Sequence, residues 1–460
     1  MSQQLPSAFI HSLQNVKGFD EAAFIQVHAS GQQLTSVRRN PGKIFNDDKS
    51  IFNNEPEKVY WASNGFYLAS RPSFTLDPLF HAGAYYVQEA SSMFLQQALQ
   101  QTVDLSQPIK VLDLCAAPGG KSTLIQSILQ GESLLVSNEV IKTRVNILSE
   151  NITKWGAANV IVTNNDPKDF QRLDEYFDVI VVDAPCSGSG LFRKDANAID
   201  EWSLNNVQLC GQRQQRILAD IMPALKQGGI LIYSTCSYSA VEDENICDWL
   251  KEEFKMESLQ LRVDDNWGII ETIAEKEKAY GYRFYPDKVK GEGFFIAAFK
   301  KTESTEFEQH TKKARAGVEK VSKAEIAIVQ PWLKIGENYF FIKQNDDIIA
   351  MPQYLENELT IIQSSLYIKK AGVKMGAVIR NELIPDPELA ISAIINDNIS
   401  SVNVDLETAL QYLRKQEMKI ETTIKGWALI KYQQLALGWM KILPNRINNY
   451  YPKEWRIVNK

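Results

Sequence analysis

Residues 111–123, which read VLDLCAAPGGKST, decide the expected fold because an apolar strand runs into a glycine turn and then into a helix. Four further apolar runs lie at residues 133–139, 159–166, 177–185 and 228–236, with helical patterns between them. Buried parallel strands have this continuous apolar character, and helices connect them across both faces of the sheet. The sequence therefore predicts an α/β protein with a doubly wound, Rossmann-like domain.

The carboxyl ends of these strands carry residue types expected of a nucleotide site. The glycine turn lets a ligand approach its backbone closely. It comprises Cys115, Ala116, Ala117, Pro118, Gly119, Gly120 and Lys121. Glu139 ends the second strand and can accept both hydroxyls of a ribose, and Asp166 ends the third and can bind an adenine edge. Either acid could instead cap a helix or face solvent. Their alignment at one edge favours an adenosine-containing cofactor, whereas the missing G-x-G-x-x-G disfavours a dinucleotide.

Two cysteines follow the fourth and fifth strands, Cys186 in DAPCSGSG and Cys236 in STCSYS. A free cysteine is most often a small buried hydrophobe, which is what we expect of Cys210 and Cys247 in helical segments. The five cysteines show no C-x-x-C spacing, and histidine is absent between residues 81 and 310. This segment therefore offers neither a zinc ribbon nor a Ser-His-Asp triad, and we expect no metal. Two thiols at the ligand edge indicate covalent catalysis.

An adenosyl cofactor beside a thiol suggests methylation of an unreactive ring carbon, such as C5 of cytosine. A thiolate that adds to C6 makes C5 nucleophilic toward a sulfonium methyl group, and loss of the C5 proton and of the thiol releases 5-methylcytosine. Asp183, near the first thiol, can hydrogen-bond the amino edge of the base or the cofactor. The residues alone leave open which thiol attacks.

Several ordered motifs resemble the Nop/Sun family of RNA cytosine-5 methyltransferases, over residues 36–299. They are YYVQEASSM (85–93), DLCAAPGGKS (113–122), DAPCSGSGLFRKD (183–195) and YSTCSY (233–238) followed by EDEN (242–245). The resemblance implies that Cys236 attacks C6 and that Cys186 helps to release the product. It also implies that S-adenosyl-L-methionine binds to the 115–121 turn, Glu139, Asp166 and Asp183.

Arg193 and Lys194, in the stretch LFRKD, are candidates for contacts with RNA phosphates or with the target base. A surface pair that merely stabilises a loop would have the same sequence.

The flanking segments resemble the bacterial subgroup that methylates 16S ribosomal RNA and carries a C-terminal PUA-like domain. The stretches concerned are residues 71–93 and 437–457. We therefore expect an α+β N-terminal extension that binds RNA (1–83) and a methyltransferase domain that depends on S-adenosylmethionine (84–300). A linker (301–322), a small α+β domain (323–395) and a PUA-like RNA-binding domain (396–460) should follow.

The overall composition fits a globular protein, with 44% hydrophobic residues and a net charge of −6. Two stretches are locally basic, residues 359–381 and 441–460, and could hold a polyanion such as RNA, although any single lysine there could simply be solvated. No apolar run reaches the roughly 18 residues of a membrane span, and the start lacks a signal-peptide pattern. We expect a cytoplasmic monomer with RNA as its partner.

Other functions remain open on the sequence alone. The substrate could be transfer RNA or large-subunit ribosomal RNA. A DNA cytosine-5 methyltransferase would attack with the Pro-Cys thiol, Cys186, and would leave the Thr-Cys motif without a role. An NAD-dependent oxidoreductase lacks its glycine fingerprint here, and a non-enzymatic RNA-binding protein would not need two thiol motifs.

Overall fold

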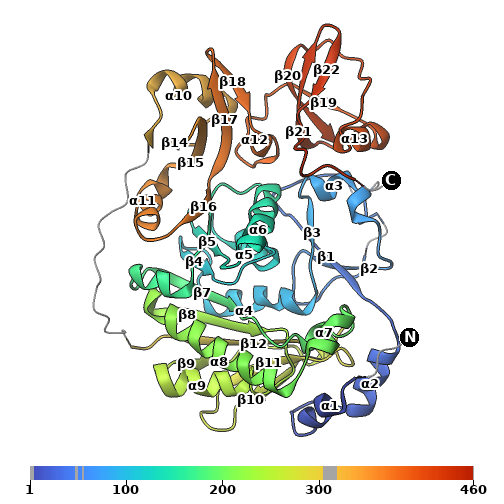
Figure 1. Cartoon of the computed structure of the whole chain (residues 1–460), viewed down its shortest axis with the longest axis vertical. Helices are drawn as coiled ribbons and strands as arrows, with labels where there is room; N and C mark the ends of the chain where they lie inside the picture. Colours follow the sequence, from blue (N-terminus) through green and yellow to red (C-terminus); the bar gives the residue numbers. More distant parts are fainter. Residues whose placement is uncertain (1–4, 47–49, 54–55, 304–318, 459–460) are drawn as a thin grey trace.

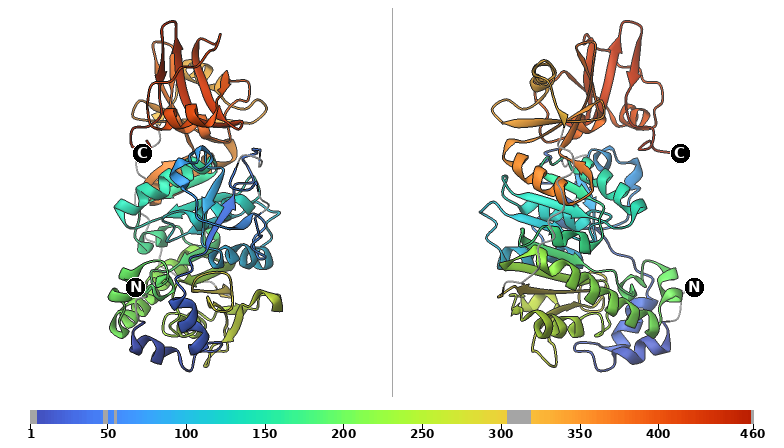
Figure 2. Two further views of the ribbon diagram at one scale, coloured as in Figure 1. Left: turned by 90° about the vertical axis from the view of Figure 1, so that its right-hand side faces the viewer. Right: turned by 60° about the vertical axis from the view of Figure 1, so that its left-hand side comes forward.

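The computed structural model describes residues 5–46, 50–53, 56–303 and 319–458. Its parts are stacked along the long axis of the molecule, with α1 and α2 at one end and the C-terminal sheets at the other (Figures 1 and 2). The predicted linker falls mostly outside the described residues. No described helix is long and apolar enough to cross a membrane.

The central sheet confirms the predicted Rossmann-like core. Its parallel strands are β4 (Lys110–Asp113), β5 (Leu134–Asn138), β6 (Val160–Thr163), β7 (Phe177–Asp183) and β8 (Leu225–Thr235). The spatial order is β8-β7-β4-β5-β6, so the chain reverses direction across the sheet between β4 and β7. Ligands bind in such sheets at the carboxyl ends of the strands that flank this reversal.

Helices cover both faces of this sheet, as continuous apolar strands require. One face packs against α4 (Leu95–Thr102), α5 (Gly120–Ile128) and α6 (Lys142–Trp155). The other packs against α8 (Leu204–Ile221) and α9 (Glu244–Phe254). Beyond β8 the sheet continues through antiparallel strands: β9 (Glu257–Leu259), β10 (Ile270–Ile273), β11 (Tyr280–Phe284) and β12 (Phe294–Lys300).

The N-terminal part combines a helical pair with a small sheet. Helices α1 (Ser7–Leu13) and α2 (Glu21–Ala29) pack through Phe9 and Phe24 onto Tyr238, two residues past the second thiol. The sheet has the order β2 (Gly65–Leu68), β1 (Thr35–Arg39), β3 (Tyr85–Val87), and α3 (Pro78–His81) precedes β3. This part therefore lies directly beside the active-site segments.

Two antiparallel sheets form the C-terminal part. The first contains β13 (Glu319–Lys320), β14 (Tyr339–Gln344), β15 (Asp347–Pro352), β17 (Val373–Ile379) and β18 (Glu382–Pro385). The second contains β20 (Gly426–Tyr432), β21 (Leu435–Leu443) and β22 (Arg446–Asn449), with β19 (Ser401–Asn403) parallel to β20. The accompanying helices are α10 (Lys323–Val329), α11 (Glu356–Ser365), α12 (Pro387–Ile391) and α13 (Leu406–Leu413).

One C-terminal strand joins the catalytic sheet, which the sequence analysis did not predict. Strand β16 (Ile368–Ala371) pairs antiparallel with β6, so that Ile368 lies opposite Thr163. Buried side chains before it, including Met351, Leu359 and Leu366, belong to the same hydrophobic cluster as the α8 and α9 face of the sheet. The region after residue 323 therefore shares a core with the catalytic domain.

A half-buried lysine connects all three parts of the chain. The Nζ of Lys43 donates hydrogen bonds to the carbonyl oxygens of Ala82, Lys154 (2.8 Å) and Ile391 (3.1 Å), which lie at the carboxyl ends of α3, α6 and α12. Helix carboxyl ends attract a cation because their carbonyls are unpaired and carry partial negative charge. One ammonium group thus ties the N-terminal, catalytic and C-terminal parts together.

Candidate active site

The predicted cofactor turn lies at the carboxyl end of β4 and shapes a cavity of about 180 Å³. Gly119, with φ of 116°, occupies the left-handed region immediately before α5, which glycine adopts at little cost. The cavity is lined by turn residues, by Asp183 and by residues 86–89 and Ser92 of the N-terminal side. Burial raises the pKa of Cys115 well above its usual range, so its thiol stays protonated.

An N-terminal arginine supports this turn from behind, which the sequence analysis missed. Arg38 is 2% exposed and donates hydrogen bonds to Gln88 Oε1 (2.8 Å), the Gly120 carbonyl (3.2 Å) and Thr123 Oγ1 (2.6 Å). Strand β1 thereby fixes the first turn of α5. Partners 82 and 85 residues away leave no local pattern from which this contact could be read.

Glu139 directly follows β5 and is buried. Its side chain is 3% exposed, and its Oε1 accepts the N–H of Ile141 at 2.9 Å. Its Oε2 lies 3.4 Å from Arg144 Nη1 but accepts no hydrogen bond from any described residue. A buried carboxylate oxygen without a hydrogen-bond donor is unusual, and a ligand hydroxyl would satisfy it.

Asp166 is more exposed and already has protein partners. Its carboxylate accepts the N–H of Lys168 (3.1 Å) as the cap of the short helix η4 (Pro167–Arg172), and it lies 3.5 Å from Arg216 Nη1. The alternative considered from the sequence, a helix cap, is therefore present. The side chain remains 43% exposed, so an adenine edge can still reach it.

Asp183 and Lys121 form an ion pair between the cofactor turn and the thiols. Lys121 Nζ lies 2.8 Å from Asp183 Oδ2, and Asp183 Oδ1 accepts the hydroxyl of Ser234 at 2.9 Å. Although burial opposes the charge on Lys121, the Asp183 carboxylate raises the pKa of that ammonium above its ordinary value. Lys121 therefore stays charged at neutral pH, and the ion pair fixes its position beside Asp183.

The two predicted thiols, those of Cys186 and Cys236, are in contact. Cys186 Sγ and Cys236 Sγ lie 2.9 Å apart, just past the carboxyl ends of the neighbouring strands β7 and β8. Hydrogen bonding to Cys236, followed by burial, raises the pKa of Cys186 well above its usual range. Cys186 thus remains a thiol in contact with Cys236, and either sulfur can be the donor. Cys210 and Cys247 lie buried in α8 and α9, away from this pair.

Arg193, one of the two candidates for RNA contacts, is directed into the protein, since its side chain is only 5% exposed. It donates to the carbonyls of Gln32 (2.6 Å) and Gly291 (3.3 Å) and lies 3.4 Å from Glu292 Oε2. Arg193 therefore joins the N-terminal part to the catalytic domain. Lys194 is exposed and remains available to RNA.

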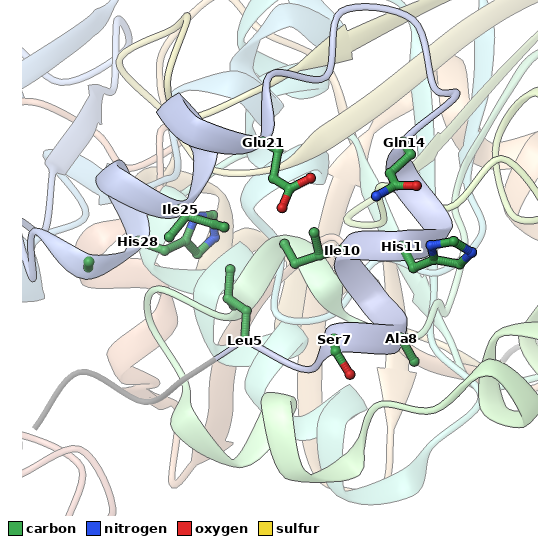
Figure 3. A pocket seen from close by; sticks show the side chains of 10 residues that line it. Leu5, Ser7, Ala8, Ile10, His11, Gln14, Glu21, Ile25 and His28 are labelled. Atoms are coloured by element: carbon green, nitrogen blue, oxygen red, sulfur yellow. The ribbon is translucent and has the colours of Figure 1, made fainter.

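A larger cavity, of about 960 Å³, lies between α1 and α2 (Figure 3). Ile10, Ile25, His11 and His28 are among its lining residues, which include none of the predicted site residues. In the described chain, no group of three His, Cys, Asp or Glu side chains is arranged to hold a metal ion. The chemistry therefore gathers at the carboxyl edge of β4, β7 and β8.

A reversed parallel sheet, a glycine turn at its switch point and paired thiols beside that turn define a Rossmann-type methyltransferase. Three family models match the chain. They describe the N-terminal domain of 16S rRNA methyltransferase RsmF (residues 5–90), 16S rRNA methyltransferase RsmB/F (100–300) and the RsmF PUA domain (400–457). The chain belongs to the RsmB/F family of 16S rRNA methyltransferases, which confirms the resemblance seen in the sequence.

Similar proteins cover most of the chain. Ribosomal RNA small subunit methyltransferase F of Vibrio vulnificus (strain YJ016) is 30% identical over 414 residues, 86% of this chain and 84% of its own length. The protein of the same name from Aeromonas salmonicida is 29% identical, covering 98% of this chain and 97% of its own.

Among solved structures, a methyltransferase homologue from Pyrococcus horikoshii is 29% identical with a TM-score of 0.52, covering 65% of this chain and all of that one. NSun6 from Pyrococcus horikoshii with SFG is 18% identical with the same TM-score, covering 65% of this chain and 98% of that one, and shares the fold.

Proposed function

We propose that this protein methylates C5 of a cytosine in 16S ribosomal RNA, using S-adenosyl-L-methionine and a transient bond between Cys236 and C6. The observation that carries the proposal is the 2.9 Å separation of two thiols next to the Lys121–Asp183 ion pair. Family membership supplies the substrate class. One chain provides all of these groups, so a cytoplasmic monomer suffices.

The residues at this edge fit S-adenosyl-L-methionine, which supplies an electrophilic methyl group when bound. Glu139 has a buried oxygen that accepts no hydrogen bond from a described residue and could accept a ribose hydroxyl. The cavity beside the turn, lined by residues 115–118, Gly120 and Lys121, would hold part of the cofactor. Asp166 lies at the end of the next strand, where the adenine would be bound.

Cys236 is the thiol that bonds to C6 of the target cytosine. Its attack leaves electron density at C5, which takes up the methyl group. The C5 proton then leaves to a base, and the C6–Sγ bond breaks with its electron pair returning to Cys236. Cys186 lies within hydrogen-bond distance of Cys236 Sγ, so its S–H can donate to the departing thiolate and stabilise it. Asp183 is positioned to orient the base through its amino edge.

The target cytosine must be unstacked to reach the thiols, because they lie at a sheet edge that a base in a helix cannot enter. Looped or unpaired cytosines should therefore be preferred.

The function is tested by supplying labelled S-adenosylmethionine with 16S rRNA, 23S rRNA, transfer RNA or DNA in separate reactions. We expect label in 5-methylcytosine of 16S rRNA only. Label in DNA, or in transfer RNA alone, would contradict the proposal. Bisulfite sequencing of 16S rRNA from cells that lack the gene would then identify the position.

A further inference from the structure

Glu242 lies directly behind both thiol segments. It is fully buried, and both of its carboxylate oxygens are occupied. Oε2 accepts the hydroxyls of Ser187 and Ser237, both at 2.6 Å. Oε1 accepts the N–H of Ser187 at 2.7 Å and Nε2 of Gln214 at 3.3 Å.

These bonds link two segments that are far apart in the sequence. Ser187 directly follows Cys186 in the segment after β7, and Ser237 directly follows Cys236 in the segment after β8. One carboxylate group therefore holds the residue next to each thiol. The backbone N–H of Gly190 adds a bond to the Cys236 carbonyl at 2.8 Å, which leaves Glu242 as the charged centre of the contact.

We propose that Glu242 is a positioning residue for the thiol pair: its carboxylate holds the two cysteine segments together so that Cys186 can assist release of the bond that Cys236 makes. The inference rests on the proposed function for its catalytic meaning. The geometry alone requires a group with four acceptor positions, because every partner of Glu242 is arranged as a donor.

A glutamine at this position would keep the size of the side chain but replace one acceptor oxygen with an NH₂ donor. Facing the N–H donors, the NH₂ would lose both of their bonds. Facing the hydroxyls, it would force them to accept, so the charge-assisted bonds that they now donate would be lost in either case. Asp248 offers a matched control. It is a buried carboxylate in α9 that accepts the N–H groups of Lys276 (3.0 Å) and Glu277 (2.7 Å), and neither of these residues lies in a thiol segment.

The experiment measures thiol proximity with phenylarsine oxide, which binds tightly only where two thiols can reach one arsenic atom. The Cys236→Ala protein sets the background. Glu242→Gln should bind the arsenical at least tenfold more weakly than the unaltered protein, whereas Asp248→Asn should stay within twofold of it. The double variant Ser187→Ala with Ser237→Ala keeps the carboxylate but removes two of its donors. It should show the same loss of arsenical binding, and it provides the test if Glu242→Gln does not fold.

With RNA and cofactor present, Glu242→Gln should also accumulate a covalent RNA adduct, as expected for Cys186→Ala, while Asp248→Asn should not. Unchanged arsenical binding in the folded Glu242→Gln protein or in the double serine variant would overturn the inference. So would weaker arsenical binding without any adduct, provided that Cys186→Ala does accumulate the adduct under the same conditions. Because the arsenical measurement needs neither RNA nor cofactor, its result stands apart from a failure of the proposed function.

Discussion

Cys186 and Cys236 share one contact but should fail differently when each is replaced. Cys236→Ala leaves no group to attack C6, so it should be inactive and carry no RNA. Cys186→Ala can still attack, and its adduct should persist because the donor to the departing thiolate is missing. A denaturing gel should show a slow, nuclease-sensitive band for Cys186→Ala only, and the double variant should lose it. A band in Cys236→Ala alone would reverse the two assignments.

The raised pKa of Cys186 gives a pH dependence with a definite sign. Donation to Cys236 stabilises the protonated form of Cys186, so removal of the acceptor should lower the pKa of Cys186. Alkylation of Cys186 by iodoacetamide should therefore begin at lower pH in Cys236→Ala than in the unaltered protein, where it should lie above the ordinary thiol range near 8.5. Peptide mass spectrometry across pH 6–11 provides the measurement, and an equal or higher midpoint in the variant would speak against the contact.

Replacing either Glu139 or Asp166 should weaken cofactor binding. Loss of a charge-assisted hydrogen bond to a ligand hydroxyl costs about 1.5–3 kcal/mol, so Glu139→Ala should lower affinity roughly ten- to a hundredfold. Calorimetric titration measures this effect, with Glu150→Ala on the outer face of α6 as the control.

Asp166 needs a second comparison because it also caps η4. Asp166→Ala should lose cofactor affinity and about 1 kcal/mol of stability, whereas Asp166→Asn keeps a capping side chain and should lose affinity alone. Full affinity in the Glu139 variant and in both Asp166 variants would remove the adenosine assignment.

Among single elements, the sequence predicted those strands whose local hydrophobic pattern is distinctive. The strands around residues 111, 134, 160, 179 and 230 were visible because both of their faces are buried and their apolar runs are continuous. Strand β16 was missed because it reads IKKA, with Lys369 exposed, and its partner strand lies about 200 residues earlier. The contacts of Arg38 and the bond between Glu242 and Ser187 were missed for the same reason, since these partners are distant in the sequence.

The segment that leads into β16 should matter to the catalytic core. Leu366 is 1% exposed within the cluster under the central sheet, so Leu366→Ala should lower the free energy of unfolding by about 2–5 kcal/mol. Ile361, on the outer face of α11 and 41% exposed, serves as the control and should change it by less than about 0.5 kcal/mol. Denaturant unfolding distinguishes the two, and equal effects would mean that this segment does not seal the core.

For the whole molecule, the structure distinguishes the basic side chains that are available to contact RNA from those already held in ion pairs within the protein. Three lysines already form ion pairs within the protein. Lys370 pairs with Glu388, Lys374 pairs with Asp347 and Asp386, and Lys441 pairs with Glu382. Exposed Arg446, Lys453 and Arg456 form no ion pair with any residue that the structure describes. The C-terminal basic stretch therefore offers RNA fewer free charges than its composition suggests.

Replacing Arg446, Lys453 and Arg456 together by alanine should weaken RNA binding and reduce the slope of log affinity against log salt by about 2–3, since each lost phosphate contact contributes roughly 0.7–0.9. Replacing Lys370, Lys374 and Lys441 removes the same net charge and should leave the slope nearly unchanged. Filter binding at several salt concentrations tests both triple variants, and equal slopes would show that the tail does not contact phosphates directly.

The hydrogen bonds of Lys43 and the pairing of β16 fix the distance between the C-terminal sheets, where RNA is bound, and the thiols, where a cytosine is methylated. Moving the C-terminal part away from the catalytic part would break the bond between Lys43 and the Ile391 carbonyl and the pairing of β16 with β6. An RNA gripped by the C-terminal sheets must therefore present its cytosine at one set span from that grip. The distance across the folded RNA between the bound segment and the cytosine then decides which cytosine enters the active site, more than the sequence between them does. Any bending that this requires must come from the RNA.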